Sequence, residues 1–342
     1  MPTREEPDGC VDAPRVHAGF EAVVDADEEV FILYSELQKQ ISDGTSPRGL
    51  GHVDHRKNVL TIVIELEGGE LPHDDLEHQA KSKKRRTKKK TKNETRRVED
   101  KTIEVEIAQD TTALRSRKGD TGSVLWHASV DFARSVLQQA YLNSPISMFN
   151  FDKLRNQHIF ELGAGTGILS LLLSPLCRRY TATDIPELMP LIQKNIAINF
   201  SPGSTISSPT IVTQPLDWIS LKNTPLHRRR ALFPVENLID VLLIVDCIYH
   251  PSLLPPLIET IDFLATPGQT AVVVVSELRS EQVIREFLEL WLAIPGWVIH
   301  RSPMDIFFGP YVVWMGRKEK EHSMQSQSME LSNTNGNATT VK

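Results

Sequence analysis

The chain has 342 residues, 24% of them charged, and a formal net charge of −6. This length predicts one or two domains with a full hydrophobic core. The three cysteines include no pair at metal-ligand spacing, which indicates a reducing compartment and no metal site. No apolar run approaches the roughly 20 residues of a membrane span, and the acidic N-terminus does not resemble a signal peptide, so we expect a soluble, intracellular protein.

The N-terminal third predicts a mobile lead and a small β element. Residues 1–28 are acidic and contain three prolines, which is typical of a disordered lead. The apolar run that begins at Val30 is too short for periodicity to choose between a strand and a helix. Residues 59–66 are rich in β-branched side chains, and residues 101–107 alternate apolar and polar positions. We expect these two segments to pair, so that residues 29–110 form an accessory element on one edge of the main domain.

The connection between those strands, residues 68–100, is far longer than usual and predicts a disordered insertion. Residues 81–97 hold 11 Lys or Arg and one acid, a net charge of +10 that leaves −16 on the rest of the chain. One interpretation is a solvated insertion. The others are a nuclear or nucleolar address, or an arm that binds RNA phosphates. Because the segment contains no aromatic residue, any RNA contact should be weak, non-specific and salt-sensitive.

A glycine-containing loop over residues 111–125 leads into Trp126, which stands just before an apolar periodicity typical of a helix over residues 129–142. An isolated tryptophan is usually a core residue. Because this loop is polar and tight, a position at the edge of a binding site is the alternative.

The main domain is organised around residues 159–168, which predict a strand, a tight turn and the start of a helix. Gly163, Gly165 and Gly167 alternate in the turn, and Glu161 precedes them. Glycine lets the main chain approach a ligand closely, and the free N–H groups of the following helix point back at the turn. The third glycine comes one residue too early for a dinucleotide fingerprint. A glycine turn without a ligand is the alternative interpretation.

Acidic and aromatic residues follow the next strands. Asp184 ends a short strand 17 residues after the last glycine, where an acid reaches ribose hydroxyls in a βαβ unit. Asp217 and Trp218 end the third strand, where they could hold an adenine or serve as a helix cap and a core residue. Asp246 and Tyr249 follow a nearly all-apolar segment typical of a buried central strand. Since open α/β sheets bind ligands at the carboxyl ends of their strands, we expect these side chains to share one crevice.

Alternating strands and helices from residue 151 to 317 predict an α/β fold with a doubly wound parallel sheet. Two closing strands, at residues 297–300 and 311–315, form the expected hairpin. The polar tail, residues 318–342, is expected to be disordered.

Five separated motifs in this order resemble those of the family 16 protein-lysine methyltransferases. They are Trp126 after Thr-Gly-Ser-Val-Leu, Glu161-Leu-Gly-Ala-Gly-Thr-Gly, Thr183-Asp184, Leu216-Asp-Trp218 and Asp246-x-x-Tyr249. The resemblance covers about residues 30–317 and implies a seven-strand class I methyltransferase sheet, Rossmann-like, within residues 111–317. The front part is most similar to the ribosomal lysine N-methyltransferase 5 group, which implies a large-subunit ribosomal protein as substrate.

The resemblance also implies roles for single residues. Those that would bind S-adenosylmethionine are Trp126, Gly163, Ala164, Gly165, Asp184, Trp218 and Val245. Glu161 would brace the glycine turn. Asp246 and Tyr249 would be catalytic and face the incoming lysine, Asp246 by orienting the amine and Tyr249 by walling its channel.

Two rival functions share this fold. One is a ribosome-assembly or RNA-binding protein whose methyltransferase domain is inactive. The other is a small-molecule methyltransferase. A base-amine or amide methyltransferase is disfavoured because its Asn/Asp-Pro-Pro-Tyr motif is replaced here by Asp246-Cys-Ile-Tyr249. We further expect a monomer with no membrane partner, located in the cytoplasm or alternatively in the nucleus or nucleolus.

Overall fold

The computed structural model describes residues 19–42, 51–69, 98–112, 121–144, 147–200, 210–235, 237–303, 307 and 309–320. The basic segment 81–97 lies outside these residues, so its predicted disorder and RNA contact remain predictions. The first 18 residues of the predicted lead and the tail from residue 321 also lie outside them.

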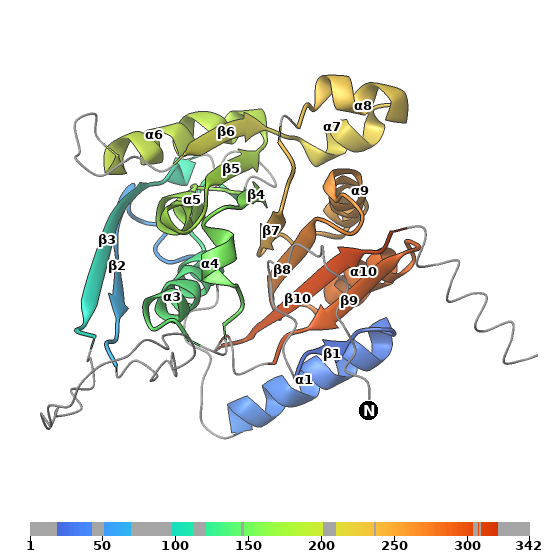
Figure 1. The fold of residues 1–342 in the computed structure, drawn as a ribbon, viewed down its shortest axis with the longest axis horizontal. Coiled ribbons are helices and arrows are strands. Elements are labelled where there is room, and N and C mark those ends of the chain that lie inside the picture. The colour runs from blue at the N-terminus through green and yellow to red at the C-terminus, as the bar shows by residue number, and fades with distance from the viewer. Residues whose placement is uncertain are drawn as a thin grey trace, which may run out of the picture.

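A mixed sheet of eight strands runs through the middle of the described chain (Figure 1). Its strand order is β1-β9-β10-β8-β7-β4-β5-β6. The strands are β1 (Glu21–Ala22), β4 (His158–Leu162), β5 (Arg179–Asp184), β6 (Ile211–Pro215), β7 (Val241–Val245), β8 (Ala271–Glu277), β9 (Trp297–Arg301) and β10 (Tyr311–Lys318). The strands β6, β5, β4, β7 and β8 are parallel neighbours, and β10 is antiparallel to both β8 and β9. The predicted doubly wound sheet with a closing hairpin is therefore confirmed.

Helices cover both faces of the sheet and enclose two hydrophobic cores. On one face lie α3 (His127–Tyr141), α4 (Phe151–Leu154), α5 (Ile168–Leu173) and α6 (Met189–Asn199), and on the other α1 (Ala26–Ser42), α7 (Trp218–Asn223), α9 (Leu254–Leu264) and α10 (Glu281–Leu292). Three short 3₁₀ turns are η1 (Ser174–Leu176), η2 (Pro186–Leu188) and η3 (Pro251–Leu253). In β7 alternate side chains enter opposite cores, Leu243 one and Leu242 the other. This explains why the segment is apolar throughout.

The segment after residue 20 is ordered, so the prediction of a mobile lead is wrong for residues 21–28. The strand β1 pairs with β9, and α1 packs against α10. The ambiguous run at Val30 lies in a helix whose buried residues, Ala26, Glu29, Val30 and Leu33, repeat at helical spacing. Asp25, just before the helix, accepts a hydrogen bond from the Glu28 N–H at 2.8 Å. The buried Glu29 of α1 also accepts a hydrogen bond from the indole of Trp314, in β10, at 2.8 Å. Residues 21–42 thus belong to the main domain.

The predicted pairing of residues 59–66 with residues 101–107 is confirmed. The strands β2 (Val59–Leu66) and β3 (Lys101–Ala108) form a separate antiparallel two-stranded sheet. It packs on α3 and α6 (Figure 1), so it covers a helical layer and does not extend the edge of the main sheet.

Two side chains of α6 hold β3 in place. Asn195, which is fully buried, accepts from the Ala108 N–H at 2.7 Å and donates to the Ala108 carbonyl at 3.0 Å. Asn199 makes the same pair of bonds to the backbone of Glu106. Asn195 also donates to the Thr166 carbonyl at 2.9 Å, which ties the accessory sheet to the glycine turn.

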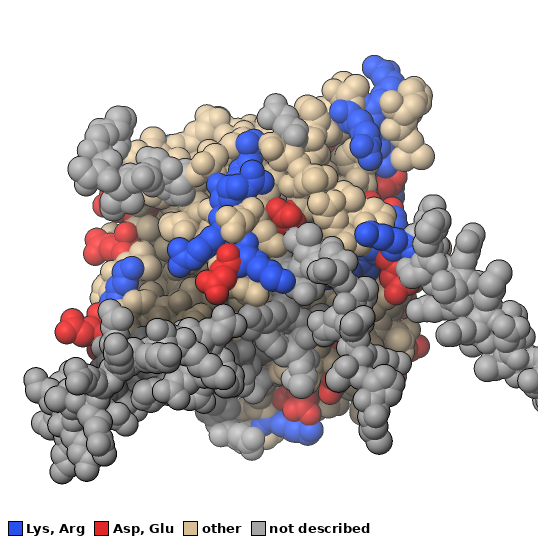
Figure 2. Space-filling model, in the orientation of Figure 1, with Lys and Arg blue, Asp and Glu red and all other residues tan. Residues whose placement is uncertain are grey.

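A helical pair that the sequence analysis did not predict follows β6. It consists of α7 and α8 (Leu226–Leu232), and α7 packs on α9. The buried Arg229 anchors α8 by donating to Glu259 at 2.6 Å. Leu226 and Leu232 are largely exposed, and Figure 2 shows basic side chains among tan surface at this corner of the molecule.

Candidate functional site

A cavity of about 880 Å³ opens at the carboxyl ends of the parallel strands β4, β5 and β7. All nine residues predicted to bind the cofactor or act in catalysis line it: Trp126, Gly163, Ala164, Gly165, Asp184, Trp218, Val245, Asp246 and Tyr249. Those that follow β4, β5 and β7 come together because these strands are parallel neighbours, so their carboxyl ends meet at one edge of the sheet. Trp126 is the residue before α3, and Trp218 is the first residue of α7.

The glycine turn between β4 and α5 forms the floor of this cavity. Gly163, Gly165 and Gly167 have φ values of 70°, 56° and 79°, which lie in the left-handed region that favours glycine. A Cβ atom on Gly163 would lie 2.5 Å from the Cys247 Sγ, and one on Gly165 would lie 3.1 Å from the Gly122 carbonyl oxygen. Both the backbone conformation and the close packing therefore require these glycines.

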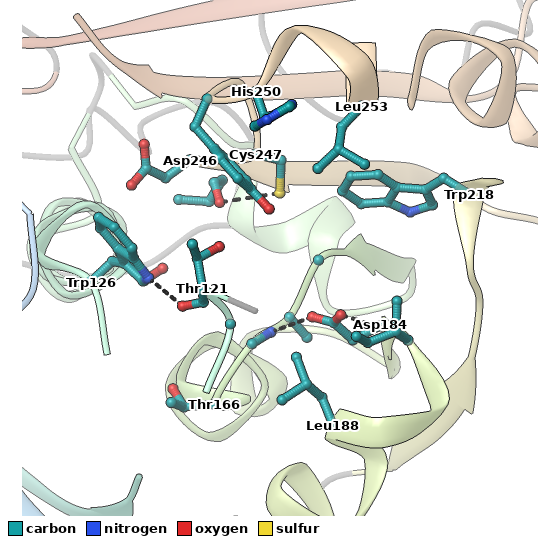
Figure 3. Close-up of a pocket in the computed structure, with 18 of the residues that line it drawn as sticks. Thr121, Trp126, Thr166, Asp184, Leu188, Trp218, Asp246, Cys247, His250 and Leu253 are labelled. Carbon is teal, nitrogen blue, oxygen red and sulfur yellow. Dashed lines mark hydrogen bonds between the residues drawn. The ribbon is translucent and has the colours of Figure 1, made fainter. Parts of the chain in front are cut away.

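Asp184, at the end of β5, is hydrogen-bonded to the backbone of the glycine turn. Its Oδ2 accepts from the Gly165 N–H and its Oδ1 from the Ile185 N–H, both at 2.7 Å, and Figure 3 shows the bond to the glycine turn. The carboxylate thus has a fixed position at the cavity wall. An acid held in this way can also accept hydrogen bonds from ligand hydroxyl groups.

Glu161 lies beneath the turn and does not line the cavity. It is fully buried in β4 and accepts a hydrogen bond from the Tyr180 hydroxyl at 2.9 Å. Burial raises the pKa of Glu161 to about 8, and the Tyr180 hydroxyl opposes that shift. Its backbone carbonyl accepts from the Thr183 hydroxyl at 2.6 Å, so Glu161 joins β4 to β5 directly below the glycines.

Two tryptophans lie on opposite sides of the cavity (Figure 3). Trp218 is the first residue of α7, and its ring would lie 3.4 Å from a Cβ on Gly163. Its indole nitrogen is buried and has no hydrogen-bond partner among the described residues. Asp217 accepts from the Ile219 N–H at 2.9 Å and from the Ser220 hydroxyl at 2.6 Å, so the cap interpretation holds for this acid.

Trp126, on the other side, is fixed by three contacts. Its indole nitrogen donates to the Thr121 carbonyl at 2.8 Å, as Figure 3 shows. The centroid of the Trp126 ring lies 4.2 Å from that of the His52 ring, and the two residues also form an isolated antiparallel β-bridge. The guanidinium of Arg279 lies 4.4 Å from the ring centroid. Trp126 is therefore part of the cavity wall, which favours the edge-of-site interpretation over the core interpretation.

Asp246 follows β7 in a left-handed conformation with φ of 59°, which is uncommon for a residue that is not glycine. Its side chain is only 5% exposed and forms an ion pair with Arg279. Burial raises the pKa of Asp246 to about 6, and the positive charge of Arg279 limits that rise. Tyr249, three residues later, also lines the cavity.

The sequence analysis missed Arg279, although it also lines the cavity. Arg279 donates to Glu277, the last residue of β8, at 2.8 Å as well as pairing with Asp246. The position of Arg279 just beyond a buried parallel strand could have indicated a site residue, by the same rule that selected Asp246.

The cavity suits a nucleoside ligand in both size and lining. Its volume lies within the usual range for cofactor pockets. The glycine turn leaves room for close backbone approach and Asp184 can accept from hydroxyls. Figure 3 shows the apolar side chain of Leu253 beside Trp218 and that of Leu188 beside Asp184. Among the described residues, no group of three or more His, Cys, Asp or Glu side chains could hold a metal ion. Within the same part of the chain, no helix has the length and apolar character needed to cross a membrane.

Seven of the eight strands, β4 to β10, have the order of a methyltransferase-type α/β sheet with a glycine turn after β4 and an antiparallel last strand, and β1 is added at the edge beside β9. The model of a family described as lysine methyltransferase matches residues 104–291, more than half of the chain. The chain therefore belongs to this lysine methyltransferase family.

Similar curated proteins have more than one named activity. The chain is 29% identical over 188 residues to the diaminohydroxyphosphoribosylamino-pyrimidine deaminase of Schizosaccharomyces pombe. It is 32% identical over 135 residues to EEF1A lysine methyltransferase 3 of Xenopus tropicalis, and 28% over 161 residues to protein-lysine methyltransferase METTL21E of Bos taurus. These matches cover 54%, 40% and 47% of this chain, and 41%, 53% and 49% of those proteins. The chain thus spans about half the length of these relatives.

Proposed function

We propose that this protein is an S-adenosylmethionine-dependent protein-lysine N-methyltransferase. The observation that carries the proposal is the convergence of a cofactor-type lining and an acid–tyrosine pair on one cavity. Membership of the lysine methyltransferase family and the printed names of two relatives support the same activity.

Each part of the cofactor would have a partner among these residues. Gly163, Ala164 and Gly165 would pass under the methionine and ribose, and Asp184 would accept from the ribose hydroxyls. The Trp218 ring would pack on the adenine, with Val245 lining the same pocket. Trp126 would close the methionine end. When bound, the cofactor supplies an electrophilic methyl group on a sulfonium.

The chain's own contribution to transfer would be alignment and control of the acceptor's proton. To accept that methyl group with its lone pair, a lysine nitrogen would have to be neutral and in line with the sulfonium, and the residues of this cavity would hold it there. The ammonium, whose reference pKa is ~10.4, must first lose a proton to water. A cavity poor in water and beside a sulfonium lowers that pKa. Asp246 would orient the amine and Tyr249 would wall its channel, because alignment at near contact supplies several kcal/mol of the acceleration.

The proposed substrate is a protein of the large ribosomal subunit. This rests on the similarity of the segment before Trp126 to the ribosomal lysine N-methyltransferase 5 group. One relative's name instead specifies EEF1A, so an elongation factor is the competing substrate class.

The test is transfer of labelled methyl groups from S-adenosylmethionine to two purified acceptors, large ribosomal subunits and elongation factor 1A. We expect label in a large-subunit protein that survives nuclease and is recovered as methylated lysine after acid hydrolysis. Asp246→Asn should abolish most transfer while leaving cofactor affinity within about twofold, because the acid faces the acceptor. Lost cofactor binding with turnover per bound cofactor preserved would refute that role.

Other outcomes separate the rival functions. Label in the elongation factor alone would replace the substrate and keep the activity. Absence of label from all proteins of a cell extract, together with salt-sensitive RNA binding that requires residues 81–97, would support the inactive assembly factor.

A further inference from the structure

A single cation, Arg279, links two buried acids that come from neighbouring strands. Its guanidinium pairs with Asp246 beyond β7 and donates to Glu277 of β8 at 2.8 Å. The side chains of Asp246 and Glu277 are 5% and 2% exposed, whereas that of Arg279 is 27% exposed. Because two buried carboxylates repel each other, the charge of Arg279 offsets that repulsion.

The same guanidinium is also coupled to the tryptophan that closes one side of the cavity. It lies 4.4 Å from the centroid of the Trp126 ring, within the range of a cation–π interaction. The segment before β2 is hydrogen-bonded to the backbone on both sides of Trp126. The Val53 N–H donates to the Leu125 carbonyl at 2.9 Å, and the His127 N–H donates to the Gly51 carbonyl at 3.0 Å. Arg279 thus links the acceptor-side acid, Asp246, to the neighbouring Trp126 in the cavity wall.

The formal charges of Asp246, Glu277 and Arg279 add up to a net negative charge, which one further cation would neutralise. Asp246 and Glu277 carry two negative charges when ionised, and Arg279 carries one positive charge. The remaining charge of −1 would attract an ammonium group into the cavity. Without Arg279, the two acids would raise the pKa of that ammonium and keep it charged. The nearby guanidinium has the opposite effect on the pKa of the ammonium. The arrangement therefore favours both capture of a lysine and later loss of its proton.

We propose, on the basis of the proposed lysine methyltransfer, that Arg279 is a positioning residue for the acceptor amine, which it serves by fixing the Asp246 carboxylate and linking it to Trp126. It acts through Asp246 and need not touch the substrate. Loss of Arg279 would therefore affect acceptor binding more than cofactor binding.

The pH dependence follows from the groups around Asp246. These are Arg279 and Glu277 from the β8 side, Cys247 on its own loop and Tyr311 of β10. Burial raises the pKa of Asp246 to about 6, with Glu277 adding to the rise and Arg279 opposing it. Without the cation the pKa of Asp246 would rise further, so a larger fraction of the enzyme would carry a protonated Asp246 near neutral pH.

The experiment compares full-length wild type with Arg279→Met and Arg279→Lys, using the acceptor identified by labelled transfer. We would measure kcat and acceptor KM across about pH 5 to 9, with cofactor affinity by calorimetry. Arg279→Met should raise acceptor KM by roughly tenfold and move the acid limb of kcat/KM upward by about one pH unit, with cofactor affinity within about twofold. Arg279→Lys should keep the acid limb near its wild-type position because it keeps the charge. Arg285→Met, which removes two surface ion pairs, one to Asp27 of α1 and one to Glu281 of α10, is the matched control and should change none of these values.

The inference is overturned if Arg279→Met leaves both acceptor KM and the acid limb unchanged. If Arg279→Met does not fold, the double variant Glu277→Gln/Arg279→Met keeps the formal charge of the site and should still raise acceptor KM. Wild-type values in this double variant would show that Arg279 serves only to neutralise Glu277, which also overturns the inference. Absence of transfer by the wild type would instead refute the proposed function itself.

Discussion

Asp184 accepts a hydrogen bond from the Gly165 N–H at 2.7 Å, across 19 positions of the chain. Because its other oxygen is bound to the Ile185 N–H, both oxygens of the carboxylate face backbone donors. An asparagine has only one acceptor oxygen, so its NH₂ group would face one of these N–H groups.

We therefore predict that Asp184→Asn loosens the glycine turn and weakens S-adenosylmethionine binding by roughly tenfold or more, about 1.4 kcal/mol. Titration calorimetry measures the effect. The matched control is Asp217→Asn, because Asp217 lines the same cavity but caps α7, and asparagine caps about as well as aspartate. Equal losses in both variants would contradict a specific role for Asp184.

A second prediction concerns Asn195, whose side chain satisfies both backbone groups of the buried Ala108. Asn195→Ala would leave that N–H and C=O unpaired, at about 1–3 kcal/mol for each buried group. We expect a clear fall in the free energy of unfolding, together with weaker cofactor binding because the bond to Thr166 at the glycine turn is also lost. Denaturant unfolding and calorimetry measure the two effects.

The control is Asn199→Ala, which removes the equivalent pair of hydrogen bonds at the less buried Glu106 and should lower the free energy of unfolding by less. A larger fall in the free energy of unfolding for Asn199→Ala than for Asn195→Ala would contradict the argument.

A third prediction uses the close approach of Gly163 and Cys247. A Cβ on Gly163 would lie 2.5 Å from the Cys247 Sγ, and the backbone φ of 70° is itself strained for alanine by roughly 1–2 kcal/mol. Gly163→Ala should therefore lower the melting temperature by more than the backbone cost alone. Adding Cys247→Ala removes the clashing sulfur, so the double variant should lose less stability than the sum of the two single variants. Strict additivity would show that the clash is relieved in some other way.

The sequence predicted what depends on short stretches of chain. The glycine turn, the acid at Asp184 and the buried strand before Asp246 are each encoded within a few residues, and all lie where expected. Arg279 was missed because its meaning depends on the pairing of β7 with β8, which brings it to Asp246 from 33 positions away. The helix α1 was ambiguous because its burial depends on α10, far along the chain. Sequence alone also could not decide between a cap and an adenine ligand for Asp217, since both need an acid at the same strand end.

The last prediction concerns pH and the buried Glu161 beneath the glycine turn. Its pKa is raised from 4.5 to about 8 in the folded protein, mainly by burial. Between these two values the folded state binds the proton more tightly than the unfolded state, so the free energy of unfolding should fall as pH rises from about 4.5 towards 8 and then level off. Each pKa unit corresponds to about 1.4 kcal/mol, so the fall in the free energy of unfolding across this range should amount to a few kcal/mol. Glu161→Gln has nearly the same shape, keeps an oxygen that accepts from the Tyr180 hydroxyl and does not titrate. We therefore expect the variant to be more stable than wild type at pH 8 by a larger margin than at pH 5, as measured by denaturant unfolding at both values. Parallel stability curves for the two proteins across this range would show that Glu161 does not carry a raised pKa.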